Sequence, residues 1–372
     1  MIDQASTFLI AFSISFLATG ATVMLAPKLG GLANDTLSGP QKFHQHSVAR
    51  IGGVGLFLGY CAAAISMAAL GLGHSSPAIL LALSALPAFA IGLAEDLTKN
   101  IGVIFRLLAT MASAAIAALL LGTLLNRLDV AVLDWALRDA WIAFAFTCFA
   151  VGGIANAINI VDGYNGLSGG VCLIILGALS VVAHVVGDSM IVILSVSLAA
   201  ALLGFMLWNY PNGRIFLGDG GAYALGFLIA EIAILLVSRN PSVSPWFPLM
   251  LVAYPVWETF FSIYRKKILR NQSPGQPDGL HLHMMFYKRC VRIGQFSKDP
   301  ADKIRRNSAT SPYLWALALL CAVPAMLWWN NSPVLAVSAF AFAGIYNLTY
   351  AKIVRFKTPR WLVRRGRSAE GT

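Results

Sequence analysis

A glycine-rich stretch over residues 156–170, NAINIVDGYNGLSGG, carries side chains suited to binding and chemistry. Asn156, Asn159 and Asp162 come at the end of an apolar segment, where polar side chains are costly unless they bind something. The adjacent glycines let the backbone come close to a ligand. The natural ligand for such a cluster is a hydrated, charged group, namely a phosphate, a metal ion or a nucleotide.

Four further polar clusters share this character, because each combines carboxylates, basic side chains or histidines with glycines beside an apolar segment. They cover residues 44–53, 92–99, 209–221 and 277–289. Candidate residues in the first and last of them are His44, Arg50, His281, His283, Lys288 and Arg289.

The carboxylates supply the strongest candidates for catalysis. Glu95 and Asp96 are suited to holding Mg²⁺ or activating a nucleophile, and Lys99, one turn later, to binding a phosphate as a point charge. Glycines flank Asp219, so backbone N–H groups and a following helix N-terminus favour an anion there. A solvated pair at a helix end, and turns or caps at Asp162 and Asp219, are the plainer alternatives.

His281 and His283 are separated by one residue, so both side chains point the same way on an extended segment and diverge on a helix. The pair alone is weak evidence for a binding site. Zinc is disfavoured, because neither a cysteine pair nor a third histidine lies close by in this segment.

Composition identifies an integral membrane protein of the all-α, polytopic class. Apolar residues make up 58% of the 372 positions and charged residues 12%, whereas soluble domains average about 25% charged. We expect one domain over 1–372, with a loop at 265–311 and a basic tail at 352–372. About 11 transmembrane helices are predicted, near 6–26, 51–71, 77–94, 101–122, 139–158, 166–187, 189–208, 221–238, 245–264, 312–330 and 333–351.

The basic residues predict how these spans are oriented. With a periplasmic N-terminus and a cytoplasmic C-terminus, all of the 27 lysines and arginines except Arg127, Arg138 and Arg239 lie on the cytoplasmic side. All five polar clusters then face the cytoplasm. The net charge of +11 is explained by this asymmetry and needs no nucleic acid, and the tail is suited to anionic membrane lipid.

Clusters on one side of a membrane favour an enzyme with a cytoplasmic, water-soluble substrate. A transporter instead places ionisable groups near the midplane, and Glu231 is the only deep acidic residue in the predicted spans. A catalytically silent scaffold is the third alternative.

The clusters together resemble the motifs of the polyprenyl-phosphate N-acetylhexosamine-1-phosphate transferases, which include the phospho-N-acetylmuramoyl-pentapeptide transferases. EDLTK resembles DDxxK, NAINIVDGYNGL resembles NxxNxxDGxDGL, and FLGDGGAYALGF resembles a GDxGS/A…LG motif. PDGLHLH resembles the HxHH loop of the N-acetylglucosamine branch, and HQHSVARIGG resembles HxxPxPRxGG. The five matches keep the family's order along nearly the whole chain.

The resemblance implies transfer of an N-acetylhexosamine-1-phosphate, foremost that of N-acetylglucosamine, from a UDP-sugar to undecaprenyl phosphate, with release of UMP. It implies Mg²⁺, with Mn²⁺ as the alternative ion, a place in the bacterial inner membrane, and a homodimer. The product would begin a lipid-linked cell-surface glycan such as lipopolysaccharide. Another UDP-2-acetamido sugar and UDP-N-acetylmuramoyl-pentapeptide remain as alternative donors, although the HLH loop argues against the latter.

Carried over by position, the motifs also imply roles for individual residues. Asp219 would bind the metal together with Asp96, and Asp96 would position or deprotonate the acceptor phosphate. The remaining implied substrate contacts are Lys99 near the acceptor phosphate, Asn156, Asn159 and Asp162 on the nucleotide side, His281 and His283 at the pyrophosphate or sugar with Lys288 or Arg289 beside them, and His44 and Arg50 from the amino-terminal motif. We favour direct attack by the lipid phosphate over a covalent aspartyl intermediate.

The chain departs from the family pattern at several positions. Glu95 replaces the first aspartate of DDxxK, and Asn165 replaces the second aspartate of DGxDGL, so we assign no catalytic role to Asn165. Met284 replaces the last histidine of HxHH, and Ser47 and Ala49 replace two prolines. Because Asp96, Asp162 and Asp219 all remain, these departures predict a subfamily rather than an inactive enzyme.

Overall fold

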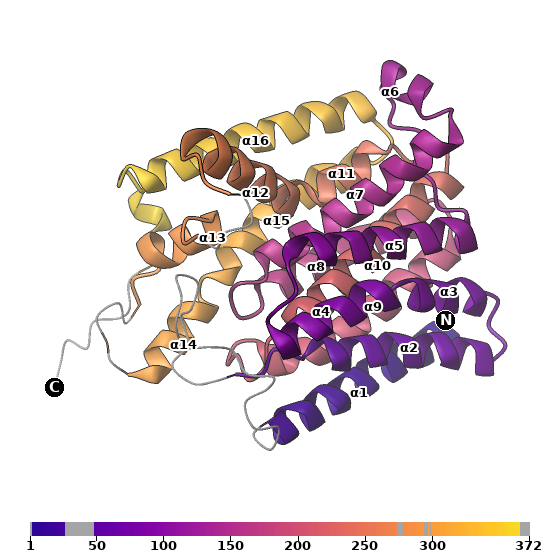
Figure 1. The fold of residues 1–372 in the computed structure, drawn as a ribbon, viewed down its shortest axis with the longest axis horizontal. Helices are drawn as coiled ribbons and strands as arrows, with labels where there is room; N and C mark the ends of the chain where they lie inside the picture. The colour runs from indigo at the N-terminus through magenta and orange to yellow at the C-terminus, as the bar shows by residue number, and fades with distance from the viewer. Residues whose placement is uncertain (1, 27–47, 274–277, 294–296, 298, 365–372) are drawn as a thin grey trace.

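The computed structural model describes residues 2–26, 48–273, 278–293, 297 and 299–364, and it is a bundle of helices (Figure 1). Within that part of the chain no β-strand is formed, and an isolated bridge joins Val291 to Arg364. The long helices are α1 (Ile2–Leu25), α2 (Gly53–Ala69), α4 (Leu86–Thr98), α5 (Val103–Leu121), α7 (Ala140–Val161), α8 (Leu167–Val185), α9 (Ser189–Asn209), α10 (Gly218–Arg239), α12 (Ala253–Tyr264), α15 (Ser311–Leu327) and α16 (Ser332–Val354).

Helix occupies all eleven expected spans, which confirms the all-α, polytopic class. Among the described residues, eight helices are long and apolar enough to cross a membrane. The other three spans are short or interrupted: α2 has 17 residues, α3 (Ser75–Ser84) meets α4 at a bend of 41°, and α11 (Trp246–Leu251) breaks before α12.

Two boundaries differ from the prediction in ways that affect the site. The helix expected from 221 begins at Gly218, so Asp219 lies in the first turn of α10 and not in a turn before it. The loop expected over 265–311 contains a π-helical extension of α12 (Arg265–Leu269), then α13 (Leu282–Met285) and α14 (Pro300–Ser308). The first boundary was not predicted because the glycines around it show no apolar periodicity. The second was not predicted because its short turns show none either.

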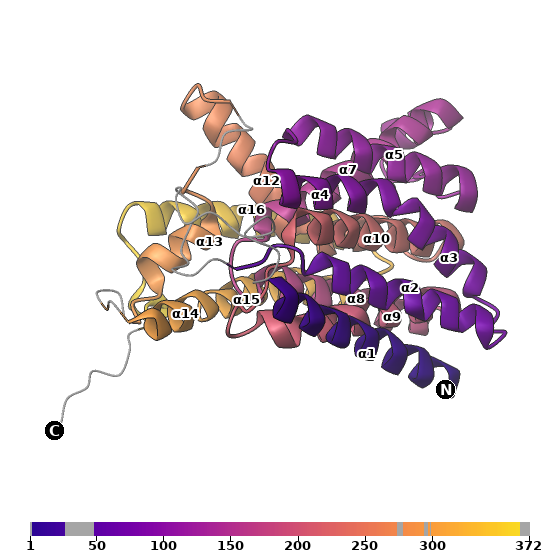
Figure 2. The same cartoon turned by 60° about the horizontal axis from the view of Figure 1, so that its bottom comes forward.

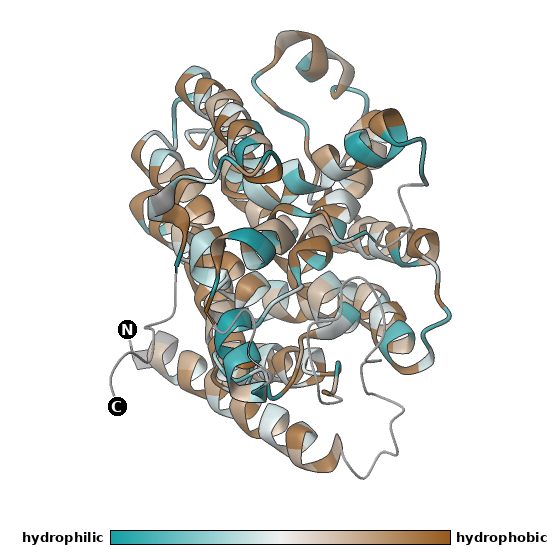
Figure 3. Ribbon diagram, turned by 90° about the vertical axis from the view of Figure 1, so that its left-hand side faces the viewer, coloured by the Kyte–Doolittle hydropathy of each residue, from teal (hydrophilic) through white to brown (hydrophobic). Residues whose placement is uncertain are grey.

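The polar clusters meet at one end of the bundle, the end that carries α13 and α14 (Figures 1 and 2). Viewed from that end, hydrophilic segments lie among apolar helices (Figure 3). Near the opposite end, Asp188 accepts hydrogen bonds from Arg239 (2.7 Å) and Asn240 (3.0 Å). The predicted segregation of the clusters is therefore present in the fold.

Helix α10 lies inside the bundle and is enclosed along its whole apolar length (Figure 1). Small residues let neighbouring backbones approach it, as is common between membrane helices. A Cβ built on Gly53 of α2 would lie 2.3 Å from the Cα of Gly221, and one on Gly92 of α4 would lie 2.6 Å from the backbone of Asp219. This close packing brings α2 and α4 to the start of α10.

We expect Gly53→Ala to lower the melting temperature of the purified protein in detergent, because the new methyl group must push α2 away from α10. Overpacking of this kind costs about 1–3 kcal/mol. Tryptophan fluorescence during heating measures the change.

Gly153→Ala in α7 is the matched control, since a Cβ there meets no atom within 4 Å. We expect that variant to melt at or above the wild-type temperature. If both variants melted like wild type, the close approach of α2 to α10 would be wrong.

Candidate active site

Asp219 is the centre of the charged cluster at this end of the bundle. Its carboxylate is almost fully buried in the first turn of α10, where the helix dipole favours negative charge. Oδ1 accepts hydrogen bonds from Arg50 and from Asn159, both at 3.2 Å, and Oδ2 forms an ion pair with Arg106. The structure thus brings together three residues from the 44–53, 156–170 and 209–221 clusters, and adds Arg106.

Asp96 fixes the N-terminus of α10. Its two carboxylate oxygens accept the backbone N–H groups of Asp219 and Gly220, each at 2.9 Å. Arg50 lies 3.9 Å from the same carboxylate. Helix N-termini have free N–H groups that need such acceptors. Asp96 on α4 therefore fixes the backbone of Asp219, and its carboxylate lies beside that of Asp219.

Asp162 follows directly after α7 and is bound by the hydroxyl of Ser168. Burial raises the pKa of Asp162 to about 6, against the opposing effects of the Ser168 hydrogen bond and of Arg50. The glycine-rich loop after Asp162 is held by Asn209, whose Oδ1 accepts the N–H of Gly166 at 2.6 Å. The side chain therefore has a fixed position and an ionisation that is sensitive to pH.

Asn165, which replaces an aspartate of the motif, has a structural role. Its Nδ2 donates to the carbonyl of Pro211 at 3.0 Å, and its own carbonyl accepts from Ser311 at 2.6 Å. Its backbone N–H donates to Asn307 at 2.8 Å. The side-chain amide thus joins the loop to the α9–α10 connection, and the backbone of Asn165 joins it to α14 and α15. The amide nitrogen is a donor, which an ionised aspartate side chain is not.

The other predicted residues divide between the cluster and its surroundings. Asn156 accepts from the hydroxyl of Tyr223, 3.1 Å away on α10. Glu95 accepts the N–H of Ile101 at 2.6 Å and so braces the α4–α5 turn. Lys99 is exposed at the end of α4, in the left-handed conformation (φ 56°). His44 lies outside the described residues.

The histidine segment reaches the glycine-rich loop through His283. Its Nε2 would lie 3.2 Å from a Cβ placed on Gly163, and its ring packs edge-on against Tyr164. Burial lowers the pKa of His283 to about 3, against the attraction of Glu258, so the imidazole is neutral near pH 7. His281 lies one step further back, bonded to Glu258.

Lys288 and Arg289, which follow the histidine segment, anchor it to neighbouring backbone. Lys288 donates to the carbonyl of Gly279 at 2.7 Å. Arg289 donates to the carbonyls of Ile353 and Val354 at the end of α16, and it lies over the ring of Phe356. The structure therefore places Arg289 away from the Asp219 cluster.

Sequence reasoning missed Arg106 as a site residue. It lies in the first turn of α5, pairs with Asp219 and sits 5.9 Å from the centre of the Tyr223 ring. A single cation inside an otherwise apolar span, ten positions after Asp96, was the signal available, since such residues usually mark functional sites.

The donor set fits Mg²⁺ shared with a substrate. In the described part of the chain no three His, Cys, Asp or Glu side chains are arranged to hold a metal ion. Mg²⁺ usually takes one or two carboxylates and completes its shell with water and substrate phosphates. Asp219 offers such a carboxylate, and Asp96 offers a second one whose oxygens already accept two N–H groups.

The fold and this cluster define a polytopic helical membrane protein with an arginine and carboxylate site at one end. Residues 78–237 match the family model described as glycosyl transferase family 4. This match confirms the resemblance drawn from the motifs.

Three relatives illustrate the similarity. A probable undecaprenyl-phosphate N-acetylglucosaminyl 1-phosphate transferase of Bacillus subtilis is 27% identical, over 76% of this chain and 77% of its own length. An undecaprenyl-phosphate α-N-acetylglucosaminyl 1-phosphate transferase of Thermotoga maritima is 26% identical, over 74% and 79%. A decaprenyl-phosphate N-acetylglucosaminephosphotransferase of Mycobacterium tuberculosis is 28% identical, over 93% and 88%.

We expect Asp162→Asn to raise the melting temperature at pH 7.5, although transfer activity is lost. A carboxyl whose pKa is raised to about 6 in the folded state favours folding below its unfolded pKa of about 3.9 and loses that contribution as the pH rises through 6. Asparagine can still accept from Ser168, without the buried charge. The gain should vanish at pH 4, which melting curves at both values test; a gain independent of pH would contradict the assignment.

We expect Asn165→Asp to destabilise the protein, because a carboxylate would face the Pro211 carbonyl and the buried donor would be lost. Leaving such groups unpaired costs about 1–3 kcal/mol. Asn331→Asp is the control, since Asn331 acts as an acceptor at the start of α16, where aspartate serves equally well. Equal melting temperatures for the two variants would refute the structural role of Asn165.

Proposed function

We propose that this protein transfers an N-acetylhexosamine-1-phosphate, foremost N-acetylglucosamine-1-phosphate, from a UDP-sugar to undecaprenyl phosphate and releases UMP. One observation carries the proposal: Asp219 meets Arg50, Arg106 and Asn159 beside Asp96 at one end of a membrane bundle. The relatives' names supply the acceptor and the sugar. The product would begin a lipid-linked cell-surface glycan.

Phosphoryl transfer requires charge neutralisation and in-line positioning of the reacting groups. The arginines and carboxylates of this cluster are suited to both. An oxygen of the lipid phosphate attacks the phosphorus that carries the sugar. The bond from that phosphorus to the bridging oxygen breaks, and its electron pair leaves with UMP. We favour this direct attack over a covalent aspartyl intermediate, because Asp96 is held by two backbone N–H groups and Asp219 by three side chains.

Each residue then has a defined task. Arg50 and Arg106 turn from Asp219 towards the phosphate oxygens, whose negative charge they offset. Asp219, with Asp96, would hold Mg²⁺, which would supply Lewis-acid stabilisation of the phosphates. Neutral His283 would donate a hydrogen bond from its remaining N–H and not act as a general acid, because burial keeps the imidazole uncharged near pH 7.

We place the site at the cytoplasmic face of a bacterial inner membrane. The basic residues other than Arg127, Arg138 and Arg239 are assigned to the side of the polar clusters, and Arg127 and Arg239 lie near the opposite end, where they bind Pro241 and Asp188. UDP-sugars are water-soluble, so a cytoplasmic opening suits the donor, while the lipid acceptor arrives within the bilayer.

We expect purified protein in detergent, given undecaprenyl phosphate, Mg²⁺ and UDP-N-acetylglucosamine, to release UMP in a manner that depends on the lipid and is abolished by EDTA. A panel of other UDP-2-acetamido sugars and UDP-N-acetylmuramoyl-pentapeptide would identify the donor. Asp219→Asn should lose at least ~10³-fold in turnover, since it removes the central charge of the site.

Asp188→Asn is the control, because it removes a buried, arginine-paired aspartate near the opposite end of the bundle. It should reduce the melting temperature and leave turnover per folded molecule unchanged. Near-wild-type turnover of Asp219→Asn would disprove its central role, and no release with any donor from folded protein would disprove the proposed reaction.

A further inference from the structure

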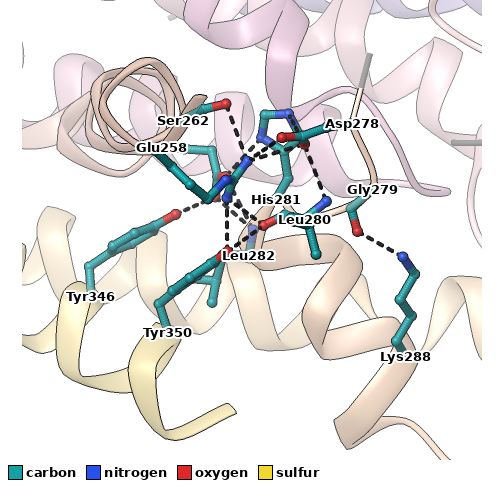
Figure 4. Close-up of polar contacts among 11 residues, drawn as sticks. Glu258, Ser262, Asp278, Gly279, Leu280, His281, Leu282, Lys288, Tyr346 and Tyr350 are labelled. Atoms are coloured by element: carbon teal, nitrogen blue, oxygen red, sulfur yellow. Dashed lines mark hydrogen bonds and ion pairs between the residues drawn. The ribbon is translucent and has the colours of Figure 1, made fainter. Parts of the chain in front are cut away.

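The segment 278–283, which contains both histidines of the HLH motif, is fastened between α12 and α16 (Figure 4). The side chain of Glu258 on α12 is fully buried and lies against His281. From α16, the hydroxyl of Tyr350 donates to the carbonyl of Leu280 at 3.1 Å. Helices α12 and α16 therefore determine where the histidines lie.

Glu258 is surrounded by hydrogen-bond donors. Its Oε1 accepts the backbone N–H of Leu282 at 3.1 Å, and its Oε2 accepts the hydroxyl of Tyr346 at 2.8 Å. The third partner is Nδ1 of His281, 3.0 Å from Oε1. An ionised carboxylate only accepts, so this geometry requires that Nδ1 carries the proton.

A second carboxylate limits movement of the same ring on its other side. Nε2 of His281 lies 3.6 Å from Asp278, which is too far for a hydrogen bond. Asp278 instead binds Arg265 through both oxygens, at 2.8 and 3.1 Å. Burial acts to raise the pKa of Asp278, but the charge of Arg265 holds it below its usual value. The ring of His281 is thus enclosed by groups that already have partners.

His281 supports His283 by stacking. The two rings are nearly parallel, at 6°, with centroids 5.3 Å apart. His283 is the member that packs on Gly163 and Tyr164, next to Asp162, and among the described residues its buried Nδ1 has no hydrogen-bond partner. An unpaired lone pair is less costly than an unpaired N–H group, so the favoured tautomer carries its proton on Nε2, the nitrogen nearest Gly163.

We propose that Glu258 is a positioning residue that sets the tautomer and ring plane of His281, so that the HLH segment presents His283 alone to the substrate. This inference rests on the proposed function. It divides the two histidines into a supporting member and a substrate-facing member. The side chain that enforces the division comes from α12, about 20 residues before the motif.

The test is a set of turnover measurements on Glu258→Gln, His281→Asn and the double variant. Loss of a partner that orients a histidine typically costs about 10–100-fold, and we expect each single variant to lose kcat on that scale with little change in KM. The double variant should be no slower than the slower single variant, because both changes break the same coupling. Losses that multiply would indicate two independent structural effects and overturn the proposal.

Two further variants separate positioning from folding. Glu231→Gln makes the same change at another fully buried glutamate, in α10, and it should keep wild-type kcat. Equal losses in Glu231→Gln and Glu258→Gln would overturn the proposal. Tyr346→Phe removes one donor to Glu258 but keeps the ring, so it should lower kcat by a smaller factor even if Glu258→Gln fails to fold.

A readout independent of turnover keeps this proposal distinct from the proposed reaction. The chain has six histidines, so ¹⁵N-histidine NMR of the detergent-solubilised protein can assign each tautomer. We expect His281 to carry its proton on Nδ1 in wild type and to exchange between tautomers in Glu258→Gln. The same Nδ1–H tautomer in both proteins would overturn the role of Glu258, whether or not any donor supports UMP release.

Discussion

The capping of α10 by Asp96 is the interaction on which the site depends. Two backbone N–H groups at the start of a buried helix would be unpaired without it, and the same contact places the carboxylate of Asp219 among Arg50, Arg106 and Asn159. It is possible only because Gly92 lets the backbone of α4 come against that of α10. Local packing, helix capping and charge balance therefore all depend on the first turn of α10.

Much of this architecture could be predicted from the sequence, because membrane spans and short polar motifs are strong signals. The eleven helical segments and the meeting of the clusters at one end followed from apolar length and charge distribution. Contacts between motifs did not, since pairs such as Arg106 with Asp219 depend on which helix faces which. The break before α12 and the short α13 and α14 were also missed, because their sequences lack an apolar period that favours either helix or loop.

The departures from the family pattern also show that a sequence does not reveal the contact partners of a side chain. Sequence comparison marks Asn165 as the loss of a charge, whereas the structure reveals a donor that joins a loop to the α9–α10 connection. The contact of Lys288 or Arg289 with substrate stays a prediction, and in the structure both side chains bind backbone carbonyls around the histidine segment. A basic side chain near a motif does not reveal whether its partner is a phosphate or a backbone carbonyl.

Both ends of α10 are held by ionic contacts, at Asp219 and, twenty residues later, at Arg239. Each added residue turns an α-helix by about 100°. An insertion or deletion between these two positions would therefore rotate one ionic contact away from its partners. The length of α10 is therefore fixed by its chemistry, and other helices would have to accommodate a change in membrane thickness.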